Sequence, residues 1–137
     1  MKNTLKKTVI WCLYLLLLSA CAPVYSPYIY DQTAELKTQS LSIMNKAMEP
    51  YQKHQVKIDM LKNDLESIRQ QEQMRKFNDV KVKQWNLLLD PDGYLLCGSF
   101  SKWKRDTIMS EDFITFQRKL VGEAFDLILE TEKLRKK

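Results

Sequence analysis

The sequence predicts an all-α protein: a small bundle of three long helices plus a short helical pair, built by residues 31–137. Two observations predict this class. Apolar residues recur at spacings of three and four along most of the chain, which is the period of an amphipathic helix. The whole chain of 137 residues also contains only three glycines, a number that fits a helix-rich domain.

The first long helix is expected after Asp31, which is a favoured N-cap residue, with Glu35 early in the helix. One predicted apolar face contains Ala34, Leu41, Met44 and Met48, and a second contains Leu36, Ile43 and Ala47. Two apolar faces indicate that neighbouring helices contact this helix on two sides. Pro50 is expected to end or kink it, because the residue before a proline avoids the α region.

The clearest periodicity in the chain runs from residue 51 to residue 68. Its positions follow the 3-4 spacing of a helical seam: Tyr51, His54, Ile58, Leu61, Leu65 and Ile68. The same register places Glu72 and Arg75 on the seam, so apolar packing is expected to stop near Ile68. Residues 69–76 are then expected to form a projecting or frayed helical end. Two heptads favour an intramolecular helical hairpin over an extended coiled coil.

Residues 79–105 allow two interpretations. Asp90-Pro91-Asp92-Gly93 predicts a type I turn, with proline at its second position and glycine at its fourth. Val80 and Val82 alternate with lysines, as in one strand of a β-hairpin. Two series at helical spacing indicate helices instead: Val82, Trp85 and Leu89 before the turn, and Leu96, Phe100 and Trp103 after it. We predict two short helices and keep the hairpin as the alternative.

The last helix is expected to begin at Ser110, with Glu111 and Asp112 in its first turn. Its predicted apolar stripe consists of Phe113, Phe116, Leu120, Ala124, Leu127, Thr131 and Leu134, widened by Val121, Phe125 and Ile128. Basic residues from Lys133 to Lys137 lie at the C-terminal end, where the helix dipole favours positive charge.

The N-terminus has a different character from the rest of the chain. Three lysines (Lys2, Lys6, Lys7) precede an apolar run from Val9 to Leu18, which is followed by Ser19, Ala20 and Cys21. Ten apolar residues match the core of an export signal, roughly 7–15 residues. A helix needs about 20 apolar residues to cross a bilayer, so export with cleavage is favoured over an uncleaved signal anchor.

The segment Leu18-Ser19-Ala20-Cys21 resembles the lipobox of bacterial lipoprotein signal peptides. The resemblance covers residues 1–22. It implies that residues 1–20 are a signal peptide that is removed, and that Cys21 becomes the first residue. It also implies a diacylglyceryl group on the Cys21 thiol and usually a third acyl chain, such as palmitate, on the new amine.

Stable anchoring takes at least two lipid signals, and the acyl chains on Cys21 would supply them. The lipid on Cys21 would therefore be the membrane anchor of the protein. In enterobacteria an Asp after the lipidated cysteine retains the protein in the inner membrane; Ala22 stands at that position here. The resemblance therefore favours a location in the outer membrane over one in the inner membrane, if the host has two membranes. It leaves open whether the domain faces the periplasm or the cell exterior.

Residues 21–30 are expected to form the lipidated cysteine and an extended tether rich in proline and tyrosine. Pro23 and Pro27 favour a polyproline-like chain that spans ~3.1 Å per residue. Tyr25, Tyr28 and Tyr30 would either lie at the level of the lipid headgroups or pack on the domain. Both alternatives stay open at this point.

The cysteines and the charge narrow the class of protein further. Cys12 lies in the removed segment, so Cys97 is alone in the mature chain and an intramolecular disulfide framework is excluded. Cys97 is expected to be buried after Leu95 and Leu96, with pairing to another chain as the alternative. Loss of the three signal lysines reduces 22 basic residues to 19 against 17 acidic ones, a net charge of +2. Such a small net charge argues against a nucleic-acid partner.

Candidate catalytic residues are few. His54 is the only histidine, and neither a zinc-ligand cluster nor a phosphate-binding glycine loop is present in the sequence. We expect His54 to be a core histidine with one hydrogen bond, although a dyad with Cys97 is formally available. The acidic pairs Asp90/Asp92 and Glu111/Asp112 are explained by a turn and a helix start. The sequence therefore predicts neither an enzyme nor a metal or cofactor site.

Three functional hypotheses follow. The first is a non-catalytic lipoprotein of the bacterial cell envelope that acts as a protein-binding or structural accessory subunit, with an envelope protein as partner. The second is an exclusion-type factor that blocks a phage, a plasmid or a toxin at the envelope. The third is a small envelope hydrolase. We favour the first.

Overall fold

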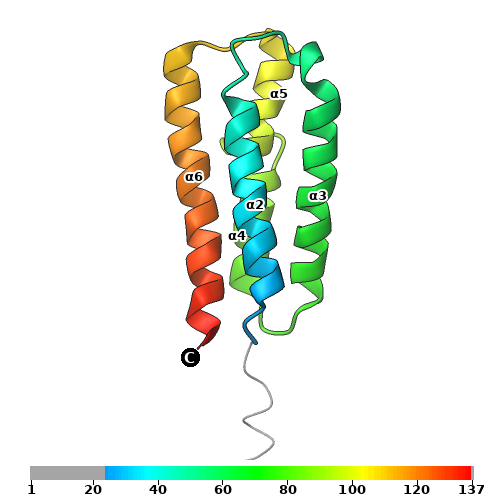
Figure 1. Cartoon of the computed structure of the whole chain (residues 1–137), viewed down its shortest axis with the longest axis vertical. Helices are drawn as coiled ribbons and strands as arrows, with labels where there is room; N and C mark the ends of the chain where they lie inside the picture. Colours follow the sequence, from blue (N-terminus) through cyan, green and yellow to red (C-terminus); the bar gives the residue numbers. More distant parts are fainter. Residues whose placement is uncertain (1–23, 137) are drawn as a thin grey trace, which may run out of the picture.

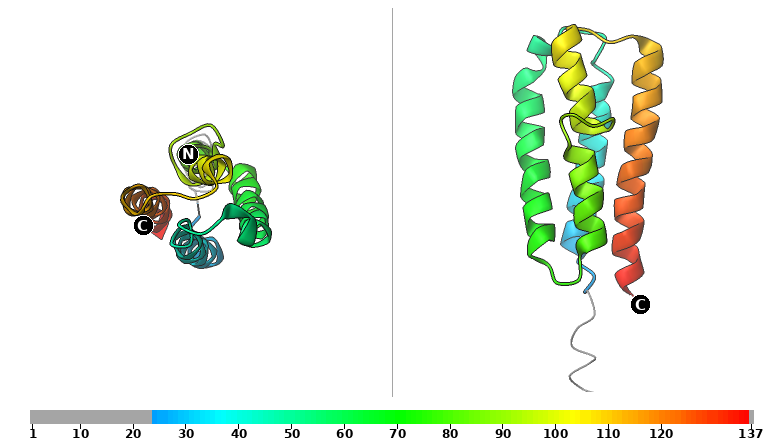
Figure 2. Two further views of the ribbon diagram at one scale, coloured as in Figure 1. Left: turned by 90° about the horizontal axis from the view of Figure 1, so that it is seen from above. Right: turned by 180° about the vertical axis from the view of Figure 1, so that it is seen from behind.

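A computed structural model describes residues 24–136, so the signal segment and Cys21 lie outside the described residues. Four columns of helix run side by side and alternate in direction (Figures 1 and 2). They are α2 (Pro27–Met44), α3 (Gln55–Met74), the stacked pair α4 (Asp79–Leu89) and α5 (Leu96–Asp106), and α6 (Glu111–Lys133). This confirms the predicted all-α bundle of three long helices and a short helical pair. Over residues 24–136 the chain forms no strand.

The two ends of the bundle are made by different segments. The end where the chain enters is formed by residues 24–30, 72–81 and 130–136, and we call it the tether end (lower end in Figure 1). The opposite, distal end is formed by residues 45–54 and 104–112, including the short 3-10 helix η1 (Tyr51–Lys53). A second 3-10 turn, η2 (Leu134–Lys136), follows α6 at the tether end.

Helix α2 begins earlier than predicted. Ser26, not Asp31, is the N-cap, and its hydroxyl accepts a hydrogen bond from the Ile29 N–H at 3.3 Å. Pro27 occupies the first helical turn, where a missing N–H costs nothing. Ile29 is buried in the core. The expectation of an extended tether through residue 30 is therefore wrong from Pro27 onwards, because a serine cap and a proline start the helix there.

Helix α2 also ends earlier, at Met44, with Asn45 as its C-cap. Its buried face contains Met44 and Leu36, one from each predicted face, the polar Thr33 and Ser40, and Ile29, which precedes the predicted helix start. At the distal end, Met109 N–H donates to Ala47 O at 2.8 Å and Tyr51 N–H donates to Thr107 O at 3.0 Å. These two backbone bonds join the loop before α3 to the loop before α6.

The seam predicted along residues 51–68 is confirmed except at its second position. Tyr51, Ile58, Leu61, Leu65 and Ile68 are all buried. His54 is only partly buried, because it is the residue just before α3. The projecting or frayed end is wrong: α3 continues to Met74 as regular helix, and Glu72 on the same seam is 0% exposed.

The short helical pair is confirmed, and the β-hairpin is excluded for residues 79–105. The turn between α4 and α5 forms as predicted: Gly93 N–H donates to Asp90 O at 3.2 Å, and Asp90 Oδ1 accepts from Asp92 N–H at 3.0 Å. The turn folds back onto α5 so closely that a Cβ at Gly98 would lie 1.8 Å from Gly93 O. Only glycine fits at position 98.

Helix α6 begins at Ser110 as predicted, with the serine hydroxyl accepting from Phe113 N–H at 3.4 Å. Its buried stripe is rotated from the predicted one: Ile114, Gln117, Val121, Gly122, Phe125, Ile128, Leu129 and Glu132. Phe116, Leu127 and Leu134, which were expected to be buried, are mostly exposed. Val121, Phe125 and Ile128, predicted only to widen the stripe, form its centre because α6 turns that side toward the other three columns.

Aromatic pairs fill the core at two levels. Trp85 and Phe125 make an edge-to-face pair with ring centroids 6.1 Å apart, and Tyr51 and Trp103 make another at 5.5 Å. Both geometries suit the quadrupoles of the rings. Trp103 also donates its indole N–H to Glu49 O at 2.9 Å.

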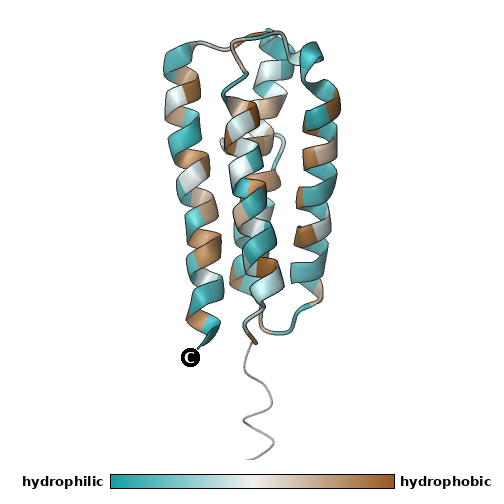
Figure 3. Ribbon diagram, viewed as in Figure 1, coloured by the Kyte–Doolittle hydropathy of each residue, from teal (hydrophilic) through white to brown (hydrophobic). Residues whose placement is uncertain are grey.

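Cys97 is buried, as predicted. Figure 3 shows the hydrophobic positions of each helix alternating with hydrophilic ones.

Candidate functional site

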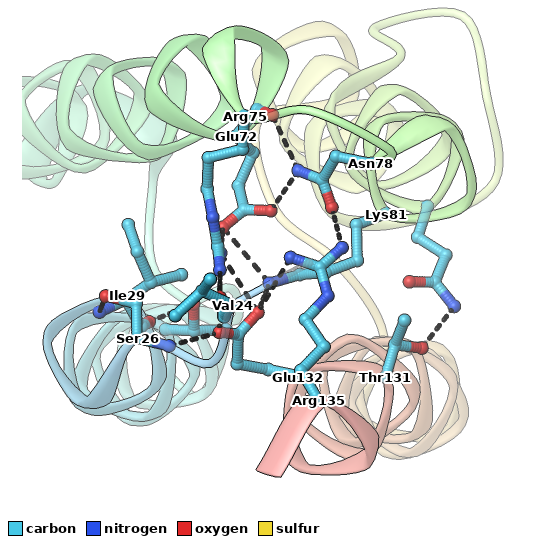
Figure 4. A network of polar contacts seen from close by, with 12 residues as sticks. Val24, Ser26, Ile29, Glu72, Arg75, Asn78, Lys81, Thr131, Glu132 and Arg135 are labelled. Carbon is cyan, nitrogen blue, oxygen red and sulfur yellow. Dashed lines mark hydrogen bonds and ion pairs between the residues drawn. The ribbon is translucent and has the colours of Figure 1, made fainter. Parts of the chain in front are cut away.

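The site predicted from the sequence, Cys21, lies outside the described residues, and the structure does not bear on its lipidation. The most unusual chemistry among residues 24–136 lies at the tether end, where the first described residues enter the bundle. At the tether end, ionised side chains from α3, α4 and α6 meet inside the bundle (Figure 4). We call this set the ionic cluster: Glu72, Arg75, Lys81, Glu132 and Arg135, together with the amide of Asn78.

Glu132 is the centre of the ionic cluster. Lys81 Nζ donates to its Oε2 at 2.6 Å, and the two outer nitrogens of Arg75 reach its two oxygens at 3.0 Å each. A fourth bond comes from the backbone: Ser26 N–H donates to Oε1 at 2.7 Å. A bidentate arginine and an ammonium are strong partners for a carboxylate, so Glu132 is fully satisfied although it is buried.

Glu72 is the second buried carboxylate. It accepts from Arg75 Nη1 at 2.6 Å, and Lys81 Nζ lies 3.1 Å from the same oxygen. Asn78 holds the last turn of α3, donating its side-chain amide to the Glu72 carbonyl at 2.6 Å and also to the Glu72 carboxylate. Arg135 in turn donates to the Asn78 side-chain oxygen and lies 3.4 Å from Glu132 Oε2.

Burial and charge compete in the ionic cluster. Burial by itself would raise the pKa of Glu132, but the hydrogen bonds from Arg75, Lys81 and the Ser26 N–H outweigh it and lower that pKa from 4.5 to about 2. For Arg75, burial acts to lower the pKa, and the hydrogen bonds to Glu132 and Glu72 raise it overall. Glu132 and Arg75 are therefore both ionised throughout the neutral range, and they form an ion pair there.

The ionic cluster also binds the first described residues of the chain. Arg75 donates to the Val24 carbonyl, and Glu132 accepts from the Ser26 N–H at 2.7 Å. These two contacts join residues that are 51 and 106 positions apart in sequence. Chemically the cluster holds no free nucleophile, and its carboxylates are all paired. The ionic cluster therefore fixes the position at which the chain enters the bundle.

The candidate catalytic residues are placed apart from this cluster. His54 lies before α3, where its Nε2 is 3.2 Å from Glu49 Oε2 and its ring is 5.6 Å from Trp103. Burial raises the pKa of the Cys97 thiol above its usual value, which disfavours the thiolate. Among the hydrogen bonds of the described residues, none joins His54 to Cys97. The dyad is therefore not assembled in this structure.

The acidic pairs have the local structural functions that the sequence suggested. Asp90 stabilises its own turn through the Asp92 N–H, and Glu111 and Asp112 lie in the first turn of α6. Within residues 24–136 no group of three or more metal-ligating side chains comes together. None of the helices described is both long enough and apolar enough to cross a membrane.

Two open grooves follow the outside of the bundle. One, of about 690 Å³, lies between α3 and α4 beside the Glu66–Arg69 ion pair. The other, of about 530 Å³, lies between α2 and α3 and includes Met60 and Lys57 in its lining. Both are surface furrows between neighbouring helices, without buried polar groups directed into them.

Sequence reasoning missed the ionic cluster, although part of the signal was visible. The register that continued the seam to Glu72 and Arg75 was correct, and it was interpreted as the end of packing. A carboxylate on a core register can also indicate a buried ion pair. Glu132, the partner on α6, directly follows Thr131 of the predicted stripe. The predicted stripe included Thr131 in place of Glu132, so the second carboxylate was not recognised as buried.

Comparison of the chain with profiles of known protein families, with curated proteins and with solved structures returned no match.

Proposed function

We propose that this chain is a non-catalytic lipoprotein of the bacterial cell envelope, anchored through a lipid on Cys21, whose helical bundle acts as a protein-binding or structural accessory subunit. One observation carries the proposal: the Leu18-Ser19-Ala20-Cys21 segment at the end of a ten-residue apolar run. A basic start, a short apolar core and small residues before a cysteine are the parts of an exported, lipid-modified N-terminus. Ala22 favours the outer membrane as the location.

The point at which the chain enters the bundle supports this proposal. The bundle starts at Pro27, only six positions after Cys21, and its entry point is held by Arg75 and Glu132. A domain with such a short connection stays close to its membrane. That suits an accessory subunit that works at the membrane surface better than one that reaches across the envelope.

A second observation supports a protein partner. Apolar side chains that the core does not use lie on the outer sides of α4 and α6: Val80, Leu87, Phe116 and Leu127. Gln84, between Val80 and Leu87 on one helical face, donates to Thr131 of α6 at 3.1 Å. Val80 of α4 and Leu127 of α6 therefore lie on adjoining surfaces, and Leu87 also lines the groove between α3 and α4. Exposed apolar patches of this kind mark interaction sites.

The anchor is tested by metabolic labelling of expressing cells with a palmitate analogue. Cys21→Ser is expected to abolish incorporation, and Cys12→Ser, in the removed segment, is expected to leave it unchanged. Labelling that persists in Cys21→Ser overturns the lipobox interpretation.

The accessory function is tested by cross-linking in intact cells. A photoreactive amino acid at Leu127 is expected to capture a specific envelope protein in stoichiometric amount, whereas the same group at Lys119, on the solvated face of α6, is expected to capture none. A protein that remains uncross-linked at Leu127, Phe116 and Leu87 alike contradicts the accessory function.

A further inference from the structure

The tether end of the bundle carries an unusual concentration of exposed apolar side chains. They are Val24, Tyr28, Met74, Phe77, Val80 and Leu134. The distal end exposes only two large apolar side chains, Met48 and Ile108. Figure 3 shows hydrophobic segments at the tether end, beside the point where the chain enters. A soluble surface would normally keep such residues dispersed, so their position at one end requires an explanation.

Phe77 is the clearest case. It lies at the tip of the loop between α3 and α4, it is 62% exposed, and its backbone has the left-handed φ of 55°. That conformation is costly for a bulky residue without a local hydrogen-bonding side chain. The next residue, Asn78, is buried and bound to Glu72 and Arg135 of the ionic cluster. The cluster therefore holds the loop in a conformation that leaves the aromatic ring of Phe77 exposed at the end of the molecule.

Lysines and tyrosines surround this apolar set. Lys133 Nζ lies 5.6 Å from the centre of the Tyr30 ring, and Lys136 Nζ lies 4.4 Å from the centre of the Tyr25 ring. Lys76 is exposed beside Phe77. Amphipathic rings and lysines with long apolar stems are the residues that settle at the boundary between lipid and water. Of the two alternatives for the tyrosines, Tyr25 and Tyr30 pack on the domain, whereas Tyr28 is exposed.

Three exposed lysines at the tether end are available to an anionic partner: Lys76, Lys133 and Lys136. The other cations of this end, Lys81, Arg75 and Arg135, are paired with the buried Glu72 and Glu132 inside the ionic cluster. Anionic headgroups attract basic residues within a Debye length of the surface.

The length of chain outside the described residues supplies the last argument. Cys21 is three residues before Val24, and three residues reach at most ~11 Å. A lipid on Cys21 would therefore place the membrane within that distance of the Val24 carbonyl, which Arg75 binds. This short connection would keep the apolar and basic surface of the tether end beside the bilayer.

We propose that the tether end is a second membrane-binding surface: Phe77 and Met74 enter the headgroup layer, and Lys76 and Lys136 bind anionic lipid phosphates. This inference rests on the proposed lipidation of Cys21. Together, the lipid and this surface would hold the bundle upright on the membrane, with its distal end and the outer sides of α4 and α6 beyond Val80 free for a partner.

The test uses the full-length protein, purified with its anchor and reconstituted into vesicles of phosphatidylethanolamine and phosphatidylglycerol. An environment-sensitive fluorophore is attached at Phe77→Cys, or at Ile108→Cys on the distal end as the matched control. Peptide mapping verifies that the buried Cys97 stays unlabelled. The label at position 77 is expected to shift to shorter wavelength and to be quenched by a headgroup-level spin-labelled lipid at least about twofold more than the label at 108.

Two charge-reversal pairs test the electrostatic part. Lys76→Glu with Lys136→Glu is expected to reduce quenching at position 77 at least about threefold, and Lys46→Glu with Lys104→Glu at the distal end is expected to change it little. Repeating the measurement in phosphatidylcholine vesicles is expected to reduce quenching in the parent protein in the same direction.

The outcomes separate this inference from the proposal beneath it. Mass spectrometry of the N-terminal peptide reports whether Cys21 carries lipid. A lipidated protein whose label at 77 is quenched no more than the label at 108 overturns the second membrane surface and leaves the anchor intact. A protein without lipid on Cys21 overturns both. A label that is quenched at 77 but insensitive to the charge pairs overturns the assignment of the lysines to lipid phosphates.

Discussion

Lys81 Nζ lies 2.6 Å from Glu132 Oε2, and both side chains are almost completely removed from solvent. The two residues are 51 positions apart and come from the first turn of α4 and the last turn of α6. A buried ammonium and a buried carboxylate are each expensive to desolvate, so such a pair is maintained only when its geometry is good and further hydrogen bonds complete it. Arg75 and the Ser26 N–H complete it here.

The first prediction concerns the loss of the central carboxylate. Glu132→Gln removes the charge that Lys81 and Arg75 share and leaves buried cations with Glu72 alone. We expect a loss of about 3–5 kcal/mol in the free energy of unfolding, because an uncompensated buried charge is costly. Urea unfolding followed by circular dichroism measures it. Glu130→Gln, which removes only the exposed pair with Lys133, is the control and should cost less than about 1 kcal/mol. Equal losses of unfolding free energy in the two variants would contradict the conclusion that the ionic cluster stabilises the bundle.

The second prediction concerns acid. The pKa of Glu132 is lowered from 4.5 to about 2 in the folded protein. Its contribution to stability is therefore complete above about pH 4.5 and is lost as the pH falls toward about 2, when the folded-state carboxylate is protonated. The loss is on the order of 3 kcal/mol. Urea midpoints across this range are expected to fall more steeply for the parent protein than for Glu132→Gln. Parallel curves would contradict the assignment.

The third prediction uses two glycines of opposite surroundings. Gly98→Ala would place a Cβ against the backbone of Gly93, with Gly93 O at 1.8 Å and Gly93 C at 2.6 Å. Because backbone must move, we expect a loss of about 2–4 kcal/mol. Gly122→Ala in the middle of α6 meets only side-chain atoms, at 3.9 Å and 4.0 Å. There the higher helix propensity of alanine is expected to raise stability by about 0.5–1 kcal/mol. Thermal unfolding of the two variants checks both signs.

The fourth prediction concerns Cys97. Burial raises the pKa of its thiol, and the thiolate is the reactive form. Alkylation of Cys97 at mildly alkaline pH is expected to be at least tenfold slower in the folded protein than in urea, because it requires local or global opening. Peptide mapping after timed iodoacetamide treatment follows the modification of this residue. Rapid modification of the folded protein would show that the thiol is accessible and would reopen the question of pairing with another chain.

Much of the fold was predictable from the sequence, because local rules specify it. The seam from Tyr51 to Ile68 was visible as a 3-4 spacing, and five of its six positions are buried. Ser110 caps its helix through the N–H three residues ahead, as serine does at many helix starts. The turn at Asp90-Pro91 also required only its own residues.

The rotation of α6 was not predictable in the same way. Phe116 and Leu127 are as hydrophobic as Phe125 and Ile128, and they lie on an adjoining face of the same helix. Both faces are apolar enough to be buried. Only the positions of the three other columns decide which face is covered. The start of α2 at Ser26 was missed for a local reason: Asp31 and Ser26 are both good caps, and the buried Ile29 favours the earlier one.

By itself the sequence determined which segments are helical, where the turn between the short helices falls, and that the N-terminus has the pattern of a lipid-modified export signal. These properties depend on residues within a few positions of one another. The tertiary structure alone decided that Glu72 and Glu132 are core residues and that Phe77 is exposed at the tether end. A carboxylate is stable in a core only when cations surround it, and those cations come from helices that are distant in sequence and meet only when the bundle has formed.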